Sequence, residues 1–350
     1  MALTRRQFIG TAGRAAVGIT ALGVASCQPA SSSKVQATHS PSPSPTPTPS
    51  ATPPPVPLAI AAMRAKSYPG SPLTVIQPLA PGNNYSQSIA TYKSDGLTIR
   101  GLLTIPSGTA PLSGWPVIIF NHGFIPPAQY RTTERYVAYV DAIARRGYIV
   151  FKSDYRGHGS SEGPPSSAYG TPDYTVDVLN ALTTLQHFNQ ADANRIGFWG
   201  HSMGGHITLR SLVVSHDIRV AAIWGGVVAP YRDLLNWHPP PADSSPPALN
   251  RSWRQDFLSR FGTPDQNPAF WDSISPNTFL NDVTAPVQLH HSTTDEDVPV
   301  AFSQTLRQEL TAVGKPVELF TYPGDNHNIS SNFNTAMSRS IAFFDRALKA

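Results

Sequence analysis

The sequence predicts an α/β fold, built on a mainly parallel sheet with helices covering both of its faces. Short apolar runs that end in glycine-containing loops alternate with segments of helical period from about residue 115 to the end. Such alternation is typical of a parallel sheet. The apolar runs are continuous rather than alternating, which indicates strands buried on both faces. The roughly 290 residues after position 57 suffice for one large core.

The expected elements follow one another in a simple order. Residues 88–106 predict two β segments around a turn at 94–96. Further strands are expected within 115–123, 148–163, 195–200, 219–227, 285–292 and 316–324. Helices are expected within 135–147, 172–188, 204–214, 301–314 and 334–350. Gly147 is a stop signal for the first of these helices, and Pro172 favours the start of the second.

One stretch breaks the alternation. Residues 230–284, rich in proline, tryptophan and asparagine, lie between two expected strands. A connection of that length is usually a lid or a binding loop, so we expect a lid-like insertion there. Its aromatic side chains either line an acyl or side-chain pocket or pack the insertion onto the core. They are Trp237, Trp253, Phe257, Phe261, Phe270 and Trp271.

The first residues have the layout of an export signal. Residues 1–26 contain Arg5 and Arg6 near the start, followed by an apolar run of ten residues, 15–24. That run is too short to cross a bilayer, which takes about 20 residues. The paired arginines indicate the twin-arginine route. The alternative is a frayed amphipathic helix with a buried thiol.

The end of this leader predicts a lipid anchor. "VASC" at 24–27 resembles the bacterial lipobox, whose cysteine, here Cys27, is lipidated after cleavage. Residues 40–57 alternate proline with serine and threonine, which favours an extended stalk inside a linker of 27–57. We therefore expect an exported protein of the bacterial cell envelope. Its folded domain, residues 58–350, would lie outside the cytoplasm and reach the membrane only through the anchor.

Composition excludes several classes of protein. Cys27 is the only cysteine, so no intrachain disulfide can form. Three of the 26 basic residues lie in the leader, which leaves 23 against 22 acidic ones after processing. A nucleic-acid binder would show a clustered basic face, and none is expected. The histidines and acids lack metal-ligand spacing and no cofactor loop is evident, so no metal and no cofactor are predicted.

A serine stands between glycines where an apolar strand meets a helix, in Gly200-His201-Ser202-Met203-Gly204. Sites in open parallel sheets form at the carboxyl ends of strands, where this serine lies. A sharp strand-to-helix turn strains its central residue and exposes the side chain, and small flanking residues leave room for the crossing backbones. The alternatives are a phosphate-binding turn or a plain turn. A nucleophilic serine also needs a base, an orienting acid and an oxyanion site.

This G-x-S-x-G elbow resembles the nucleophile elbow of the α/β-hydrolases, in which the chain order is serine, acid, histidine. Among the histidines after Ser202, His327 stands apart because "YPGDNHNIS" follows the last expected strand and can reach back over the sheet end. The others fit worse: His206 points away within its helix, His216 lies near that helix's end, His238 lies in the insertion, and His290 and His291 are adjacent on one strand.

The acid should follow the preceding strand, in "HHSTTDEDVP". This stretch looks like the family's H-G-x-x-D-x-x-V-P pattern, which selects Asp295. Asp297 is the second choice, and Glu296 is expected to be a solvated loop charge. Ser292 stands where the family has glycine, and as a small residue it should preserve the turn.

Two backbone N–H groups are expected to stabilise a tetrahedral oxyanion. One is that of Met203, at the start of a helix. "H-G-F" at 122–124 resembles the family's oxyanion loop and points to the N–H of Phe124. His122 is expected to brace this loop. The motif "SDYRGHGSSEG" at 153–163 is widespread in the fold, and its Asp154, Arg156 and His158 are expected to stabilise their own loop.

From about residue 88 to 350 the chain resembles the catalytic domain of the prolyl-oligopeptidase family, most closely over 261–310. The thirty or so residues between 58 and 88 are too few for the β-propeller of the large members. The resemblance implies a serine hydrolase that acts through an acyl-enzyme, and we expect a peptidase on short peptides. A carboxylesterase or lipase-like esterase shares every triad residue and remains the alternative. A non-catalytic binding protein on a hydrolase scaffold is disfavoured by the complete set Ser202, Asp295 and His327.

Overall fold

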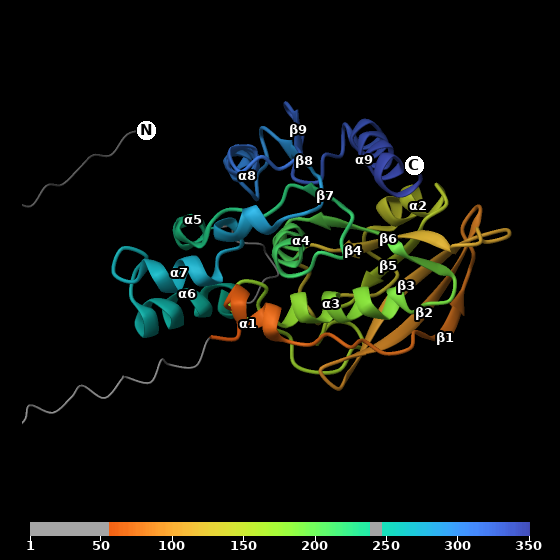
Figure 1. Ribbon diagram of the computed structural model, residues 1–350, viewed down its shortest axis with the longest axis horizontal. Helices are drawn as coiled ribbons and strands as arrows, with labels where there is room; N and C mark the ends of the chain where they lie inside the picture. Colours follow the sequence, from red (N-terminus) through yellow and green to blue (C-terminus); the bar gives the residue numbers. More distant parts are fainter. Residues whose placement is uncertain (1–55, 239–246) are drawn as a thin grey trace, which may run out of the picture. The chain divides into compact units, whose positions relative to one another are not determined.

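The structure, a computed structural model, describes residues 56–238 and 247–350 (Figure 1). Within these ranges nine strands form one sheet in the order β1-β2-β3-β5-β4-β6-β7-β8-β9. The strands are β1 (Thr74–Leu79), β2 (Tyr85–Ser94), β3 (Leu97–Pro106), β4 (Trp115–Asn121), β5 (Ile149–Ser153), β6 (Ala191–His201), β7 (Val220–Trp224), β8 (Val287–Ser292) and β9 (Val317–Tyr322). The first three pair antiparallel, as do β3 and β5. All pairs from β5 through β4 to β9 are parallel, so the mainly parallel sheet is confirmed.

Helices cover both faces of the sheet, as predicted (Figure 1). One face packs against α1 (Ile60–Ala65), α3 (Asp173–Gln186), α4 (Met203–Val214) and α8 (Val300–Ala312). The other packs against α2 (Val137–Ala144) and α9 (Phe333–Leu348). In β4, Val117 and Ile119 enter the first core while Ile118 and Phe120 enter the second. A strand buried on both faces needs a continuous apolar run, and this is why the sequence shows one.

Two elements near residue 60 to 80 were not predicted. Helix α1 has only six residues, and β1 is an edge strand whose side chains are nearly all exposed. Neither produces the hydrophobic period by which longer elements are recognised. All the strands and helices that the sequence predicts are present, with ends shifted by a few residues.

The insertion after β7 contains α5 (Tyr231–Asn236), α6 (Pro247–Phe261), α7 (Pro268–Ile274) and the 3₁₀ helix η1 (Pro276–Asp282). Its aromatic side chains pack it onto the domain. Trp253, Phe257, Phe270 and Trp271 are buried in the first core, and Trp237 and Phe261 lie half-buried against it. Packing therefore accounts for these six residues. A lid role for the segment stays a prediction.

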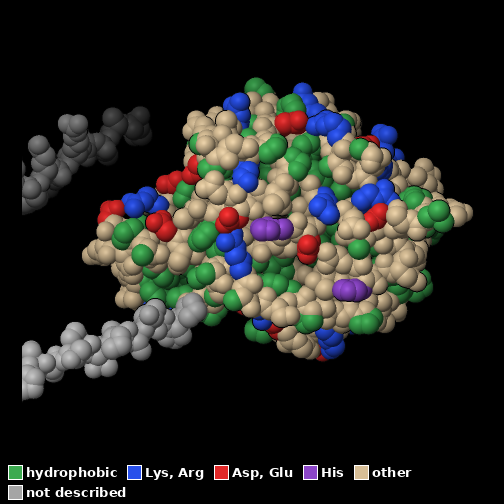
Figure 2. Space-filling view, viewed as in Figure 1, with side chains coloured by type: hydrophobic (Ala, Val, Ile, Leu, Met, Phe, Trp, Pro, Cys, Tyr) green, Lys and Arg blue, Asp and Glu red, His purple; other side chains and the backbone are tan. Residues whose placement is uncertain are grey.

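The remaining expectations concern the predicted leader and linker, and the charge on the surface of the domain. The predicted leader, Cys27 and the linker up to residue 55 lie outside the described residues. No helix in the described ranges is long and apolar enough to cross a membrane. Figure 2 shows basic and acidic side chains interspersed on the face in view, with no basic stripe across it.

Candidate active site

Ser202 lies at the turn between β6 and α4, in a strained conformation with φ 55° and ψ −119°. Non-glycine residues rarely adopt positive φ, at a cost of about 1–3 kcal/mol. The flanking glycines are required by space. A Cβ on Gly200 would lie 2.5 Å from the carbonyl oxygen of Gly204, and a Cβ on Gly204 would overlap the carbonyl oxygen of Asn121. The elbow therefore folds as the sequence predicts.

The backbone of Ser202 is tied to the end of the neighbouring strand. Its N–H donates to the carbonyl of Trp224 at 3.0 Å, and its own carbonyl accepts from the N–H of Val227 at 3.0 Å. These bonds stabilise the strained turn and lodge the serine against the residues that follow β7. One of them, Gly225, also approaches the histidine: a Cβ there would lie 3.1 Å from His327 Nδ1. Ser202 and His327 thus flank the same strand end.

His327 and Asp295 form a buried pair. His327 Nδ1 lies 2.8 Å from Asp295 Oδ2 and 3.0 Å from Oδ1. The N–H groups of Asp297 and Val298 donate to Oδ1 at 2.9 and 2.8 Å. Burial alone would raise the pKa of Asp295, but the hydrogen bonds from His291 and His327 outweigh it and hold that pKa well below its ordinary value. A permanent carboxylate next to Nδ1 keeps the proton on that nitrogen and leaves Nε2 free to accept one.

Asp297, the second choice for the acid, lies differently. Its carboxylate makes no hydrogen bond to His327, and its residue is exposed.

Among the described residues, Ser202 Oγ makes no hydrogen bond to His327. Catalytic hydrogen bonds are often long before substrate binds, so the lack of this bond is compatible with Ser202 and His327 acting as a pair.

Ser292, where the family pattern has glycine, has a partner of its own. Its hydroxyl donates to the carbonyl of Asp325, and so does the hydroxyl of Thr294, at 2.7 Å. The carboxylate of Asp325 in turn accepts the N–H groups of Asn326 and Asn332 at 2.9 Å each. These contacts fasten residues 324–332, the histidine loop, to the end of β8. The turn survives the substitution and gains a hydrogen bond that glycine could not make.

The two predicted oxyanion donors come from different segments, one from the elbow itself and one from the loop after β4. Met203 is the first residue of α4, and Phe124 follows β4 in the oxyanion loop, residues 122–124. His122 Nδ1 lies 2.7 Å from the carbonyl oxygen of Gly123, and therefore orients the peptide whose N–H belongs to Phe124. The ring of His122 is stacked between Tyr130 and Tyr155, at 4.7 and 4.2 Å. His122 thus braces the loop, as expected.

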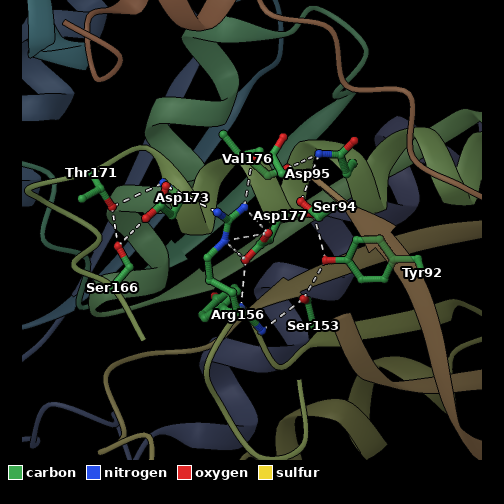
Figure 3. Close-up of polar contacts among 12 residues, drawn as sticks. Tyr92, Ser94, Asp95, Ser153, Arg156, Ser166, Thr171, Asp173, Val176 and Asp177 are labelled. Atoms are coloured by element: carbon green, nitrogen blue, oxygen red, sulfur yellow. Dashed lines mark hydrogen bonds and ion pairs between the residues drawn. The ribbon is translucent and has the colours of Figure 1, made fainter. Parts of the chain in front are cut away.

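The loop after β5 is held by buried ionic contacts (Figure 3). Arg156 lies 2.7 Å from the fully buried carboxylate of Asp177, and its guanidinium also approaches Asp95 and Asp173 at 3.3 and 3.5 Å. Asp154 accepts hydrogen bonds from the hydroxyls of Tyr130 and Thr132.

His158, like Asp154 and Arg156, belongs to the motif at 153–163. It is buried beside His122, with ring centroids 5.7 Å apart. Burial lowers the pKa of His158 to about 4, so it is neutral. All three motif residues contact neighbouring segments, Arg156 chiefly helix α3, and none contacts Ser202 or His327, which agrees with a bracing role.

Four side chains near the site escaped the sequence reasoning. His291 Nε2 lies 3.1 Å from Asp295 Oδ2, although the sequence reasoning had only set His291 aside as a candidate base. Glu296, expected to be a free loop charge, accepts the backbone N–H of His327 at 3.0 Å. Tyr136 and His201 connect the loops around Ser202. No local sequence pattern predicts these contacts, because each depends on a partner that only the fold brings near.

The described residues offer no group of three or more His, Cys, Asp or Glu arranged to hold a metal ion. The candidate site itself brings together a serine, an imidazole and a carboxylate, with backbone N–H groups close by. Such a set performs nucleophilic acyl transfer.

Comparison with known proteins agrees with this chemistry. The model of the prolyl oligopeptidase family matches residues 134–350. The chain belongs to this family. It is 26% identical to the uncharacterized peptidase YtmA of Bacillus subtilis (strain 168) over 259 residues, which cover 71% of this chain and 89% of that protein.

Solved structures support the fold of this prolyl oligopeptidase family member. Acylaminoacyl peptidase of Pyrococcus horikoshii superposes with a TM-score of 0.61 at 24% identity, over 76% of this chain and 42% of that one. Acetyl xylan esterase from Paenibacillus sp. R4 gives 0.62 at 18% identity, over 81% of this chain and 91% of that one. The chain thus spans less than half of the Pyrococcus enzyme. The α/β-hydrolase fold is confirmed, and the family member is a serine hydrolase, either a peptidase or a carboxylic-ester hydrolase.

Proposed function

We propose that the protein is a serine peptidase acting on short peptides, with Ser202 as nucleophile, His327 as general base and Asp295 as the acid that orients it. The observation that carries this proposal is the buried His327–Asp295 pair, which lies at the same strand end as the strained serine. A histidine held by a carboxylate near a half-buried elbow serine is the arrangement that acyl transfer requires.

The proposed reaction runs through an acyl-enzyme. Ser202 Oγ forms a bond to the scissile carbonyl carbon while its proton passes to His327 Nε2. The N–H groups of Met203 and Phe124 stabilise the resulting oxyanion. The intermediate then collapses: the bond to the leaving group breaks, and His327 returns the proton to that group. In the second half of the reaction His327 takes a proton from water, whose oxygen forms a bond to the acyl carbon. The bond from that carbon to Ser202 Oγ then breaks, His327 returns the proton to Oγ, and the acid is released.

Support for a peptidase comes from the family and from a relative of similar span that is named a peptidase. All nine strands of the described ranges belong to one sheet, so those ranges contain no β-propeller to restrict access. Access would then depend on the insertion of residues 230–284. An esterase is the second candidate, favoured by the likeness to acetyl xylan esterase over 91% of that chain.

A fluorophosphonate probe tests the nucleophile. It should leave one covalent adduct on the peptide containing "GHSMGG", visible as one mass increment on the intact protein. Ser202→Ala should remove the adduct and lower kcat by a factor of about 10⁶, and His327→Ala should cost nearly as much, because the two act as a unit. Ser215→Ala, at the other end of the same helix, is the matched control and should label normally. An adduct on another serine, or full activity without Ser202, would refute the assignment.

Substrate class needs a separate measurement. A panel of p-nitrophenyl esters and peptide anilides should give higher kcat/KM for the short peptide anilides, after allowance for the better leaving group of the esters. Turnover confined to the esters would replace the peptidase by an esterase and leave the triad unaffected.

A further inference from the structure

Three loops carry the proposed machinery: the elbow, residues 200–204, the oxyanion loop and the histidine loop. Two side chains join them. The hydroxyl of Tyr136 lies 2.9 Å from the N–H nitrogen of Gly123 and 2.8 Å from His201 Nδ1. His201 Nε2 lies 3.2 Å from the carbonyl oxygen of His327. A single chain of hydrogen bonds therefore runs from the oxyanion loop, through the residue preceding the nucleophile, to the residue proposed as base.

We propose that Tyr136 and His201 are positioning residues that hold the oxyanion loop and the histidine loop in register with the nucleophile elbow. Loss of the Tyr136 hydroxyl would weaken stabilisation of the tetrahedral oxyanion without weakening binding of the ground state. This inference rests on the proposed function.

The direction of each hydrogen bond in this chain is fixed by its two ends. The N–H of Gly123 can only donate, so the Tyr136 oxygen accepts there and its O–H donates a hydrogen bond to His201 Nδ1. At the other end a carbonyl can only accept, so His201 Nε2 carries the hydrogen. This arrangement requires a neutral imidazole. Burial lowers the pKa of His201 to about 3, which keeps the ring neutral near pH 7.

The bridge lies directly against the nucleophile. A Cβ on Gly123 would lie 2.7 Å from the Tyr136 hydroxyl oxygen, 3.1 Å from Ser202 Cβ and 3.3 Å from His201 Nδ1. The next peptide bond along the chain supplies the proposed donor of Phe124. Any shift of Gly123 therefore changes the distance between that donor and the oxygen it must stabilise.

The backbone of Tyr136 is strained in a way that serves this placement. It has φ 61° and ψ 23° at the start of α2, where its carbonyl accepts from the N–H of Val140 at 3.0 Å. The preceding carbonyl, of Arg135, accepts from the buried Nζ of Lys152 at 2.7 Å. A strained backbone conformation persists where the contacts around it hold it in place, and such residues cluster at functional sites.

Helix α2 makes a second contact of the same kind. Tyr139, one turn after Tyr136, donates its hydroxyl to the carbonyl of Asn328 at 2.9 Å. One short helix thus holds both the oxyanion loop and the residue after His327. A displacement of about 1 Å in a catalytic group can cost a factor of 10² in rate, and loss of an oxyanion donor costs about 10²–10³.

The test uses Tyr136→Phe in the full-length chain, with p-nitrophenyl benzoate as substrate. Phenylboronic acid serves as a tetrahedral mimic and benzoate as a ground-state ligand. We expect kcat to fall by about 10–100-fold while KM stays within about twofold. The inhibition constant of phenylboronic acid should rise by the same factor as kcat falls, and that of benzoate should stay within about twofold.

Tyr148→Phe is the matched control, because it also removes one buried hydroxyl, which donates to Asp345 at 2.7 Å, away from Ser202. It should leave all four constants within about twofold. An unchanged kcat in Tyr136→Phe would overturn the inference, and so would equal weakening of benzoate and phenylboronic acid. A fluorophosphonate adduct on Ser202 of the wild type tests the proposed function separately.

A second variant keeps the test decisive if Tyr136→Phe does not fold. His201→Asn should change the four constants in the same way as Tyr136→Phe. Because the two residues act in one chain, the double variant should be no more than about threefold worse than the poorer single one. Losses that multiply would mean that the two residues act independently, against the proposal.

Discussion

Replacing Asp295 by asparagine should disable the proposed base without changing the shape of the site. Oδ1 accepts two backbone N–H groups, from Asp297 and Val298. Those donors cannot become acceptors, so the asparagine oxygen must stay with them. The amide nitrogen then takes the place of Oδ2, 2.8 Å from His327 Nδ1, and donates to it. The imidazole proton moves to Nε2, which can no longer accept a proton from Ser202.

A histidine held in the wrong tautomer costs a factor of about 10⁴ in kcat, which is about 5.5 kcal/mol of transition-state stabilisation. Turnover of a p-nitrophenyl ester and the rate of fluorophosphonate labelling should both fall by that factor. The folded state should survive, since the volume is unchanged, both backbone bonds to the side chain remain, and His291 Nε2, which loses its contact with Oδ2, keeps the carbonyl of Val298 at 2.9 Å.

Asp297→Asn is the matched control, since that carboxylate has no hydrogen bond to His327. It should retain activity to within about threefold. If Asp297→Asn lost more than Asp295→Asn, or if Asp295→Asn kept a tenth of wild-type kcat, the structural reasoning would be wrong.

Three further outcomes are expected. Asp177→Asn removes the buried carboxylate that pairs with Arg156 and should lower the free energy of unfolding by about 3 kcal/mol in urea titrations. Asp256→Asn, which removes a carboxylate from an exposed pair, should lower it by at most about 1 kcal/mol. Burial raises the pKa of Asp154 to about 6, so the folded chain holds a proton that the unfolded chain loses near pH 4. Stability should therefore decline by about 3 kcal/mol as pH rises from 4 to 6, and Asp154→Asn should flatten that slope. If Cys27 carries a lipid, as the sequence predicts, Cys27→Ala should shift the protein from the membrane to the soluble fraction with unchanged kcat.

The chemical core of the site could be predicted from the sequence because its residues lie in short patterns with a local cause. Gly200 and Gly204 flank Ser202 because the crossing backbones have no room for a Cβ. Asp295 and His327 each follow a strand, and parallel strands bring their carboxyl ends to one edge.

The supporting shell could not be predicted, because its contacts join distant segments. Tyr136 meets His201, 65 positions away, and His201 meets His327, 126 positions away. A tyrosine at the start of a predicted helix and a histidine beside a serine carry no signal of these partners. Edge strand β1 was missed for a different reason: its exposed side chains show no hydrophobic alternation.

The order of the strands along the chain has a consequence for synthesis. The nucleophile turn and the oxyanion loop need only β4 to β7, whereas the histidine loop follows β9, near the end of the chain. We therefore predict that a chain still growing on the ribosome holds a serine without a base, and gains reactivity only when its last strand has joined the sheet. Ribosome-arrested chains ending at residue 310 should resist fluorophosphonate labelling while the released full-length chain reacts, and equal labelling of both would contradict this. Such timing would delay hydrolysis of cytoplasmic peptides until translation is complete.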